Sequence, residues 1–340
     1  MSPRDYENPI RNQQKRTALL VVLVVILVFA VILMLKVLEA KEDAIIIGDA
    51  QNKVVQAEES GLIRYGGKWY KQNPDLTTLL LIGTDSLVSG EDGKANQADF
   101  LLLVAMDYDH NNYKALQINR DTIADVPQFD MYGRVFGSKK QQIALAYSHT
   151  DSDVRNCNNT VKAVSNLLYG IDIDHFVSVA MDSVAIANDM VSGVPVYVED
   201  DFSNIDPSIK QGETVTLSGE QALHFVRARS GMEEPTNIAR MQRQRTYMTS
   251  LHERAIQKAN QDKDFLMRSL LELSSHFISD CSINQMTRMF DVALAQNHSD
   301  ILTIPGEAVM GQEYMEYHVD EAALQKQIIE LLYVEEEGME

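Results

Sequence analysis

A short stretch of the chain, residues 222–245, is basic in a protein that is otherwise acidic. Five arginines fall within nineteen consecutive residues of this stretch, at Arg227, Arg229, Arg240, Arg243 and Arg245. The whole chain of 340 residues has a formal net charge of -19. A guanidinium group is permanently charged and presents a planar fork of donors that matches a phosphate or a carboxylate. The stretch predicts an anion-binding site, and the alternative is a basic helix face that pairs with neighbouring acids.

Two elements are expected to position these side chains. A capping-box pattern begins a helix at residues 218–221, and this helix should end near Arg227. If the chain is extended there, Arg227 and Arg229 point to the same side, because strand side chains repeat every two residues. On the next helix three polar side chains share one face. They are Arg240, Arg243 and Gln244.

Charged residues also fall at the ends of three predicted strands, the apolar runs 77–83, 100–106 and 113–118. These charged residues are Asp85, Asp99, Arg120 and Asp121. Open α/β sheets place ligand sites at strand ends. Each residue alone could be a turn former or a partner in a structural ion pair. Three strand ends that together supply acids and an arginine favour a ligand site.

Helices and strands alternate along the rest of the chain, which predicts an α/β layered fold. The expected helices cover residues 141–147, 159–168, 182–190, 265–273, 283–295 and 319–333. The expected strands cover residues 174–179, 194–198 and 301–304, and a hairpin turns at Gly66–Gly67. No internal repeat or low-complexity linker interrupts residues 77–333, so one domain is expected there.

The first part of the chain predicts one transmembrane helix, residues 17–38. Residues 17–35 carry no charge, and at ~1.5 Å per residue they reach roughly 28 Å, close to a hydrocarbon core. Four basic residues precede the run, so the positive-inside rule puts the tail, residues 1–16, in the cytoplasm and everything later outside. A cleaved signal peptide is the alternative, although the run is longer than the usual apolar region of a signal peptide and no clean small-x-small cleavage site follows it.

Composition limits the partners. With 45% apolar and 23% charged residues the chain can fold and bury a core, and its acidity argues against nucleic acid as a partner. Cys157 and Cys281 lie in an oxidising compartment if the predicted topology holds, so a disulfide is permitted. Two isolated buried thiols are the alternative. Neither cysteine has a second cysteine or a histidine at ligand spacing, so spacing predicts no metal site there.

Six segments resemble, in order and in spacing, the motifs of the LytR-CpsA-Psr family, the membrane-anchored enzymes that attach glycopolymers to bacterial cell walls. The segments are Leu-Leu-Ile-Gly-Thr-Asp-Ser at 80–86, Gln-Ala-Asp-Phe at 97–100, Ile-Asn-Arg-Asp-Thr at 118–122, Leu-Ser-Gly-Glu-Gln-Ala-Leu at 217–223, Val-Arg-Ala-Arg at 226–229 and Arg-Met-Gln-Arg-Gln at 240–244. The resemblance covers residues 77–335. Residues 39–76 are then a juxtamembrane spacer and 336–340 an acidic tail.

The resemblance implies a single extracytoplasmic domain with a central mixed β-sheet, flanking helices and a deep apolar pocket for a polyprenyl tail. It implies Mg²⁺ held by Asp85 and Asp99, which agrees with the preference of hard cations for oxygen ligands. It also implies contacts to a pyrophosphate from Arg120, Arg227, Arg229, Arg240 and Gln244. Arg120, Asp121 and Arg229 are the expected catalytic residues, while Arg243 and Arg245 are expected on a solvated or ion-paired face.

The sequence departs from the family pattern in three places. Leu87 stands where the family often has an arginine, and Asn237 stands where it often has an aspartate. The segment 144–150 replaces the usual Asn-Ala-Ala-Tyr and its following glycines. Binding could survive such changes while turnover falls.

Three functions follow. The first is a Mg²⁺-dependent phosphotransferase that moves a glycopolymer from a polyprenyl-pyrophosphate carrier to peptidoglycan. The second is a membrane-anchored protein with reduced turnover that binds lipid-linked polymer. The third is a polyprenyl-pyrophosphate hydrolase. The short cytoplasmic tail disfavours a transcriptional regulator.

Overall fold

The computed structural model describes residues 62–86, 96–130, 132, 134–148, 150, 152–229, 231–232, 236–295 and 298–336. The predicted membrane-spanning helix at residues 17–38 lies outside this described part. Among the described residues, no helix is both long enough and apolar enough to cross a bilayer.

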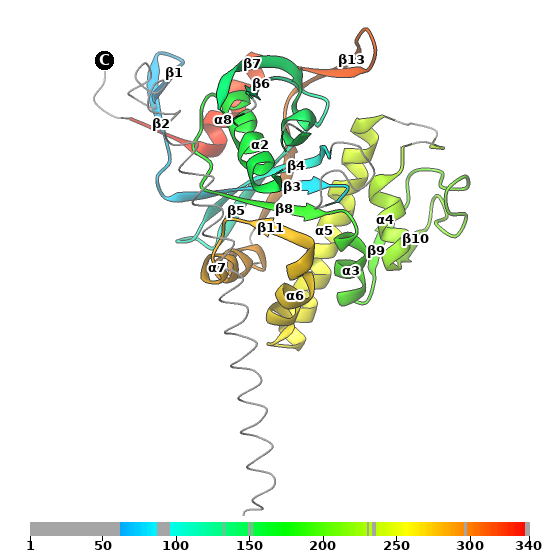
Figure 1. Ribbon diagram of the computed structural model, residues 1–340. Helices are drawn as coiled ribbons and strands as arrows, with labels where there is room; N and C mark the ends of the chain where they lie inside the picture. The colour runs from blue at the N-terminus through cyan, green and yellow to red at the C-terminus, as the bar shows by residue number, and fades with distance from the viewer. Residues whose placement is uncertain are drawn as a thin grey trace, which may run out of the picture. The chain divides into compact units, whose positions relative to one another are not determined.

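A six-stranded mixed sheet forms the centre of the fold (Figure 1). In spatial order its strands are β11 (Phe277–Ser279), β8 (His175–Ala180), β3 (Leu76–Thr84), β4 (Ala98–Asp107), β5 (Asn112–Ile118) and β12 (His298–Thr303). β3 runs parallel to β8, and β5 runs parallel to β12. The other neighbouring pairs are antiparallel. The expected mixed sheet is therefore present, and it includes every strand predicted around the charged strand ends.

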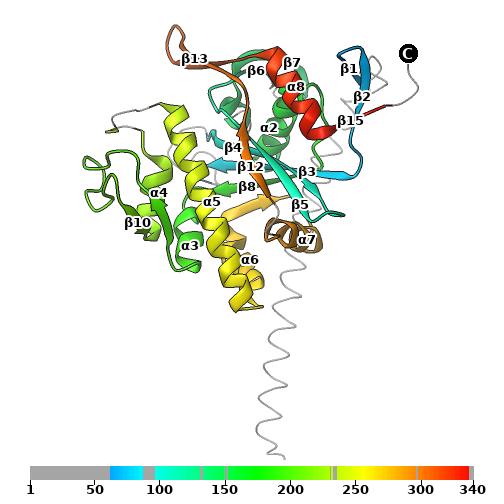
Figure 2. The ribbon, with the colours of Figure 1, turned by 180° about the vertical axis from the view of Figure 1, so that it is seen from behind.

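Both faces of this sheet are covered, which explains why β3 and β4 are continuous apolar runs. Successive side chains point to opposite faces, so Leu80 and Leu103 enter one core while Leu79 and Leu102 enter another. The first core is closed by α2 (Asp153–Leu167) and α8 (Glu321–Leu332), and the second by α7 (Ile283–Ala293). Figures 1 and 2 show these helices on opposite sides of the sheet.

A third core lies beside the sheet and holds the arginine-bearing helices. It is formed by α3 (Ser183–Met190), β9 (Val194–Tyr197), β10 (Thr214–Leu217), α4 (Gly219–Arg227), α5 (Asn237–Gln261) and α6 (Phe265–Leu273). The predicted capping box begins α4, where the Ser218 hydroxyl accepts from the Gln221 N–H and the Gln221 side chain accepts from the Ser218 N–H. α5 runs for 25 residues and carries Arg240, Arg243 and Arg245.

Three hairpins complete the described structure. They pair β1 (Leu62–Tyr65) with β2 (Lys68–Gln72), β6 (Ile123–Phe129) with β7 (Val135–Gln142), and β13 (Gly306–Met310) with β14 (Met315–Val319). β2 also pairs with β15 (Tyr333–Glu335). The predicted hairpin at Gly66–Gly67 is confirmed. The predicted helix at 141–147 is wrong in part, because residues 141–142 end β7 and a 3-10 helix covers only Ile143–Ser148.

Candidate active site

Three of the charged strand ends meet at one edge of the sheet. β3, β4 and β5 are consecutive antiparallel strands, so the end of β3, the start of β4 and the end of β5 lie side by side. The register shows this directly, because Thr84 pairs with Ala98 and Leu101 pairs with Ile118. Asp85, Asp99 and the Arg120–Asp121 turn therefore gather at this edge.

A β-bulge places Asp99. Gly83 pairs with Phe100 while Thr84 pairs with Ala98, so Asp99 is the extra residue on β4. Bulges re-aim a side chain and are common beside active sites. The bulge needs a close approach of the two strands, since a Cβ added to Gly83 would lie 2.9 Å from the Phe100 Cβ. Glycine at position 83 is thus required by the geometry that aims Asp99.

The Asp99 carboxylate lies between two buried arginines. Its Oδ1 accepts a hydrogen bond from Arg120 and lies 3.4 Å from Nη1 of Arg240. Arg240 also donates to the Asp99 backbone carbonyl at 3.2 Å, and Arg120 donates to the Gln97 side chain. Asp99 thus links the Arg120 turn to α5.

Asp121 contacts the same cluster of charged side chains through Arg120. Its Oδ1 lies 3.5 Å from Arg120 Nε and accepts a hydrogen bond of 3.1 Å from Gln142. β14 holds the turn in place, because the Tyr317 N–H donates to the Asp121 carbonyl at 2.9 Å. Burial raises the pKa of Asp121 above its usual range, although Arg120, Arg229 and Arg240 act in the opposite direction. The carboxylate is therefore a better proton acceptor than an exposed aspartate.

Arg229 brings a third positive charge. Burial, the largest cause, and the neighbouring charges of Arg229 and Arg120 together lower the pKa of Arg240 to about 10, although Asp99 acts in the opposite direction. Arg229 also acts on Asp121. Within the described part of the chain, no hydrogen bond or ion pair is formed by the Arg229 side chain. Three guanidinium groups thus face two carboxylates, and one guanidinium remains available to a ligand.

Two asparagines that the sequence did not identify as site residues connect the parts of the site. Asn237 Oδ1 accepts from Arg240 at 2.6 Å, and its Nδ2 donates to Asn119 Oδ1 at 2.6 Å. Asn119 Oδ1 also accepts from the Asp121 N–H at 3.0 Å. An aspartate at position 237 would oppose the Asn119 oxygen with a second acceptor. The departure from the family pattern at Asn237 therefore fits this particular network.

Asp85 and Arg227 form an outer pair. Arg227 Nη2 lies 2.8 Å from Asp85 Oδ1, and both side chains are exposed. α4 ends at Arg227, as the sequence predicted, and Ala228 lies outside the helix with φ -54° and ψ 130°. The two predicted metal ligands thus lie at the same sheet edge, Asp99 within the arginine cluster and Asp85 paired at its rim. Leu87 lies outside the described residues.

A protein-family model matches the part of the chain that contains this site. The model of the LytR_cpsA_psr family matches residues 35–331. The chain belongs to the LytR_cpsA_psr family. The resemblance found in the six motifs is confirmed.

Curated relatives that the chain matches are distant in sequence. The chain is 28% identical over 183 residues to the polyisoprenyl-teichoic acid–peptidoglycan teichoic acid transferase TagU of Halalkalibacterium halodurans, covering 54% of each protein. It spans about half the length of the curated relatives that it matches.

Solved structures share the fold. A structure described as TagT bound to LIIa-WTA matches with a TM-score of 0.57 and 20% identity, covering 76% of this chain and 90% of that chain. Bacillus subtilis TagV matches with a TM-score of 0.57 and 23% identity, covering 76% and 97%. These matches support the mixed α/β architecture.

The remaining polar residues of the basic stretch have structural partners. Gln244 is buried, accepts from the Gln117 amide at 3.1 Å and donates to the Val226 carbonyl at 3.3 Å. Arg243 was expected on a solvated or ion-paired face, and it is ion-paired with Asp200 at 2.7 Å but buried. Arg245 donates to the Gln117 side chain at 2.8 Å. The described hydrogen bonds of Gln244 thus do not reach the arginine cluster.

The deep apolar pocket implied by the LytR_cpsA_psr resemblance stays a prediction. One cavity of about 110 Å³ lies between β9, α4 and the first turns of α5. Its wall mixes apolar with charged side chains. Among them are Tyr197, Phe225, Ile238, Glu199, Asp200 and Arg243. This lining does not suit a polyprenyl tail.

Proposed function

We propose that this protein is a phosphotransferase that moves a glycopolymer from a polyprenyl-pyrophosphate carrier to peptidoglycan. The observation that carries the proposal is the cluster of Arg120, Arg229 and Arg240 around Asp99 and Asp121. Three guanidinium groups beside two carboxylates leave one positive charge in excess, and a bound anion would balance it. The name of the TagU relative supports a teichoic acid-like donor and a peptidoglycan acceptor.

The proposed reaction exchanges the phosphoanhydride bond of the carrier for a phosphate ester to the acceptor. The acceptor hydroxyl oxygen bonds to the phosphorus that carries the glycopolymer, and the bond from that phosphorus to the bridging oxygen breaks. Polyprenyl phosphate leaves. Arg120, Arg229 and Arg240 neutralise the charge that develops on the phosphate oxygens. Arg227, at the rim of the arginine cluster, binds the pyrophosphate from the solvent side.

Asp121 is proposed to accept the proton of the acceptor hydroxyl. Its pKa is raised by burial, which brings it closer to the value that a general base needs near neutral pH. Its contacts with Arg120 and Gln142 fix its position. Gln244 is assigned a positioning role through Gln117 and Val226, in place of the phosphate contact expected from the family pattern.

The donor set at the sheet edge fits Mg²⁺. Mg²⁺ takes one or two carboxylates together with substrate phosphate oxygens and waters, and Asp85 and Asp99 offer carboxylates beside the arginines. We propose that these two residues hold the ion, with Arg227 released from Asp85 toward the phosphate. When bound, the ion would neutralise charge on the pyrophosphate.

We further propose that the protein is anchored in a bacterial cell membrane by residues 17–38, with its N-terminus in the cytoplasm and the described residues outside. The uncharged run 17–35 and the basic residues before it support this topology. It would place the site in the compartment that contains peptidoglycan.

Reconstitution tests the proposed function. Full-length protein in detergent micelles is incubated with Mg²⁺, a short polyprenyl-pyrophosphate-linked oligosaccharide and peptidoglycan fragments, and products are identified by mass spectrometry. Transfer predicts oligosaccharide joined to peptidoglycan by a phosphodiester. Free phosphorylated oligosaccharide would show a hydrolase instead, and bound donor without product would show a binding protein.

Variants of two arginines connect that assay to the site. Arg229→Ala should abolish most of the product, because Arg229 is the guanidinium that the cluster leaves available. Arg245→Ala is the matched control on α5, since Arg245 bonds Gln117 and should retain the parent activity.

A further inference from the structure

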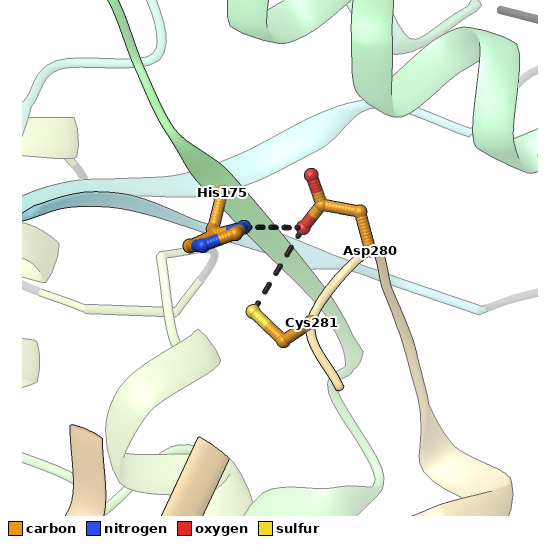
Figure 3. A group of neighbouring side chains, drawn as sticks. All are labelled: His175, Asp280 and Cys281. Atoms are coloured by element: carbon orange, nitrogen blue, oxygen red, sulfur yellow. Dashed lines mark hydrogen bonds and ion pairs between the residues drawn. The ribbon is translucent and has the colours of Figure 1, made fainter. Parts of the chain in front are cut away.

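Three metal-ligating side chains converge at a second place, away from the arginine cluster. Figure 3 shows His175, Asp280 and Cys281 pointing toward one another. His175 begins β8, while Asp280 and Cys281 follow β11 and precede α7. Because β8 is parallel to β3 and His175 pairs with Leu79, the group lies away from the strand end that carries Asp85. It belongs to a different site from the proposed phosphate site.

The spacing of the three ligand atoms approaches that of a tetrahedral metal site. His175 Nδ1 lies 3.6 Å from Asp280 Oδ1, and Cys281 Sγ lies 3.8 Å from the same oxygen. All three atoms lie within 4.8 Å of one another. Zinc bonds of ~2.0 Å to nitrogen or oxygen and ~2.3 Å to sulfur give tetrahedral edges of about 3.3–3.6 Å. A small inward movement would complete three ligand bonds.

One of the three ligand atoms lacks a hydrogen bond. His175 Nδ1 is buried and makes no hydrogen bond. Cys281 is buried as well. Asp280 Oδ1 already accepts from the Phe176 N–H at 2.9 Å, which holds the carboxylate in place. A buried nitrogen without a hydrogen bond is costly, and a bound cation would satisfy it.

We propose that His175, Asp280 and Cys281 bind a divalent cation of the zinc class. A thiolate and an imidazole favour such cations over Mg²⁺, which prefers oxygen ligands. Three protein ligands leave a fourth position for water. The ion would join β8 to the segment between β11 and α7, and this role is independent of the proposed transferase activity.

The hydrogen bonds around His175 determine which protons must move when a cation binds. Gln285 Oε1 accepts from the Ser282 N–H at 2.8 Å and from its hydroxyl at 2.6 Å, so the Gln285 amide nitrogen faces His175 Nε2 at 2.9 Å. Nε2 is therefore the acceptor, and Nδ1 carries the proton without metal. Binding moves this proton to Nε2, releases the thiol proton to solvent and requires the Gln285 amide to turn.

Because cation binding moves the proton of His175 to Nε2, Gln285→Glu is a diagnostic variant. A glutamate can keep the capping box of α7 and accept from His175 Nε2–H, as carboxylates do behind metal-bound histidines. The variant should bind the cation about tenfold more tightly than the parent, in the range of effects of such supporting residues. A purely structural role for Gln285 predicts no gain.

Cobalt provides the direct test. Full-length protein in detergent micelles, stripped with chelator and held in excess Mg²⁺, is titrated with Co²⁺ and then with competing Zn²⁺. The expected result is one Co²⁺ per chain with a thiolate-to-cobalt charge-transfer absorption that Zn²⁺ removes. The absorption should persist in Cys157→Ala, the matched control for the second buried thiol, and disappear in Cys281→Ala.

A second variant separates binding from folding. Asp280→Asn keeps the oxygen that accepts from the Phe176 N–H and loses only the charge, so it should fold while binding Co²⁺ at least tenfold more weakly. Circular dichroism without metal checks the fold of each variant. Absence of the thiolate absorption in the parent, or its persistence in Cys281→Ala, would overturn the proposal.

Discussion

Asp99→Asn removes the carboxylate that two buried arginines share. The side chains of Asp99, Arg120 and Arg240 are 12%, 10% and 5% exposed, so little water can replace the lost charge. Removing one partner of a buried ion pair costs about 3–5 kcal/mol, because the other charge stays buried without compensation. Asp121 lies 3.5 Å from Arg120 and still balances it in part. We therefore expect about 3 kcal/mol, at the lower end of that range.

The matched control is Asp85→Asn at the rim of the same site. Asp85 and Arg227 also form a carboxylate–arginine pair, at 2.8 Å, but their side chains are 55% and 47% exposed. Exposed pairs contribute about 0–1 kcal/mol because water and salt screen them. The two substitutions make the same chemical change, so the difference between their effects measures burial.

Urea unfolding of the full-length protein, followed by circular dichroism with chelator present, gives the free energy of unfolding of each variant. Inorganic pyrophosphate should then raise the stability of the Asp99→Asn variant more than that of the parent, because the anion replaces the missing negative charge. A destabilisation of Asp99→Asn under about 1 kcal/mol, or one equal to that of Asp85→Asn, would refute a buried charge cluster at this edge.

Three further predictions concern binding, pH and backbone fit. Arg229→Ala should weaken inorganic pyrophosphate binding, measured by calorimetry, by about 1.5–3 kcal/mol, while Arg245→Ala should leave it nearly unchanged. Asp121→Asn should be at least as stable as the parent near neutral pH, because a raised folded-state pKa gives stability that is lost as pH rises through that pKa. Urea unfolding at acidic and neutral pH checks this, and a less stable variant at neutral pH would contradict it. Gly83→Ala should lower the free energy of unfolding by about 1–3 kcal/mol, because its Cβ would lie 2.9 Å from a neighbouring Cβ. Gly137→Ala, with nothing within 4 Å, should change it little in the same thermal or urea melts.

The sequence predicted the central sheet because its signals are local. β3 and β4 are continuous apolar runs, and the sheet buries them on both faces. The capping box of α4 is likewise encoded within four residues, 218–221. The strand-end positions of Asp85, Asp99 and Arg120 followed from these runs, and the antiparallel order then brought them together.

The parts that escaped prediction depend on distant partners. β7 and β13 are mostly exposed strands, so they lack the apolar alternation that identifies a strand. The bulge at Asp99 depends on the pairing of β4 with β3, which ends at Thr84, fourteen positions before β4 begins. Nothing near Arg243 in the sequence reveals its bond to Asp200, 43 residues away.

The same limit applies to the two clusters of polar side chains. Asn237 bonds Asn119 across 118 residues, and a pattern of family motifs treats it only as a departure. His175 is separated from Asp280 and Cys281 by more than a hundred residues, so ligand spacing along the chain could not reveal their meeting. Cys157 and Cys281 are both free and buried, in different cores, which agrees with the alternative of two isolated thiols.

The support that late strands give to the Arg120–Asp121 turn has a consequence for how the protein is made. Tyr317 bonds the Asp121 carbonyl, Gln142 bonds both Asp121 and the Met315 carbonyl, and β12 lies against β5. A ribosome delivers these late partners last. The proposed phosphate site can therefore mature only after synthesis of the C-terminal strands, and contacts of such long range slow folding. Until then the growing chain exposes an unfinished sheet edge, the state in which helper proteins and proteases would meet it.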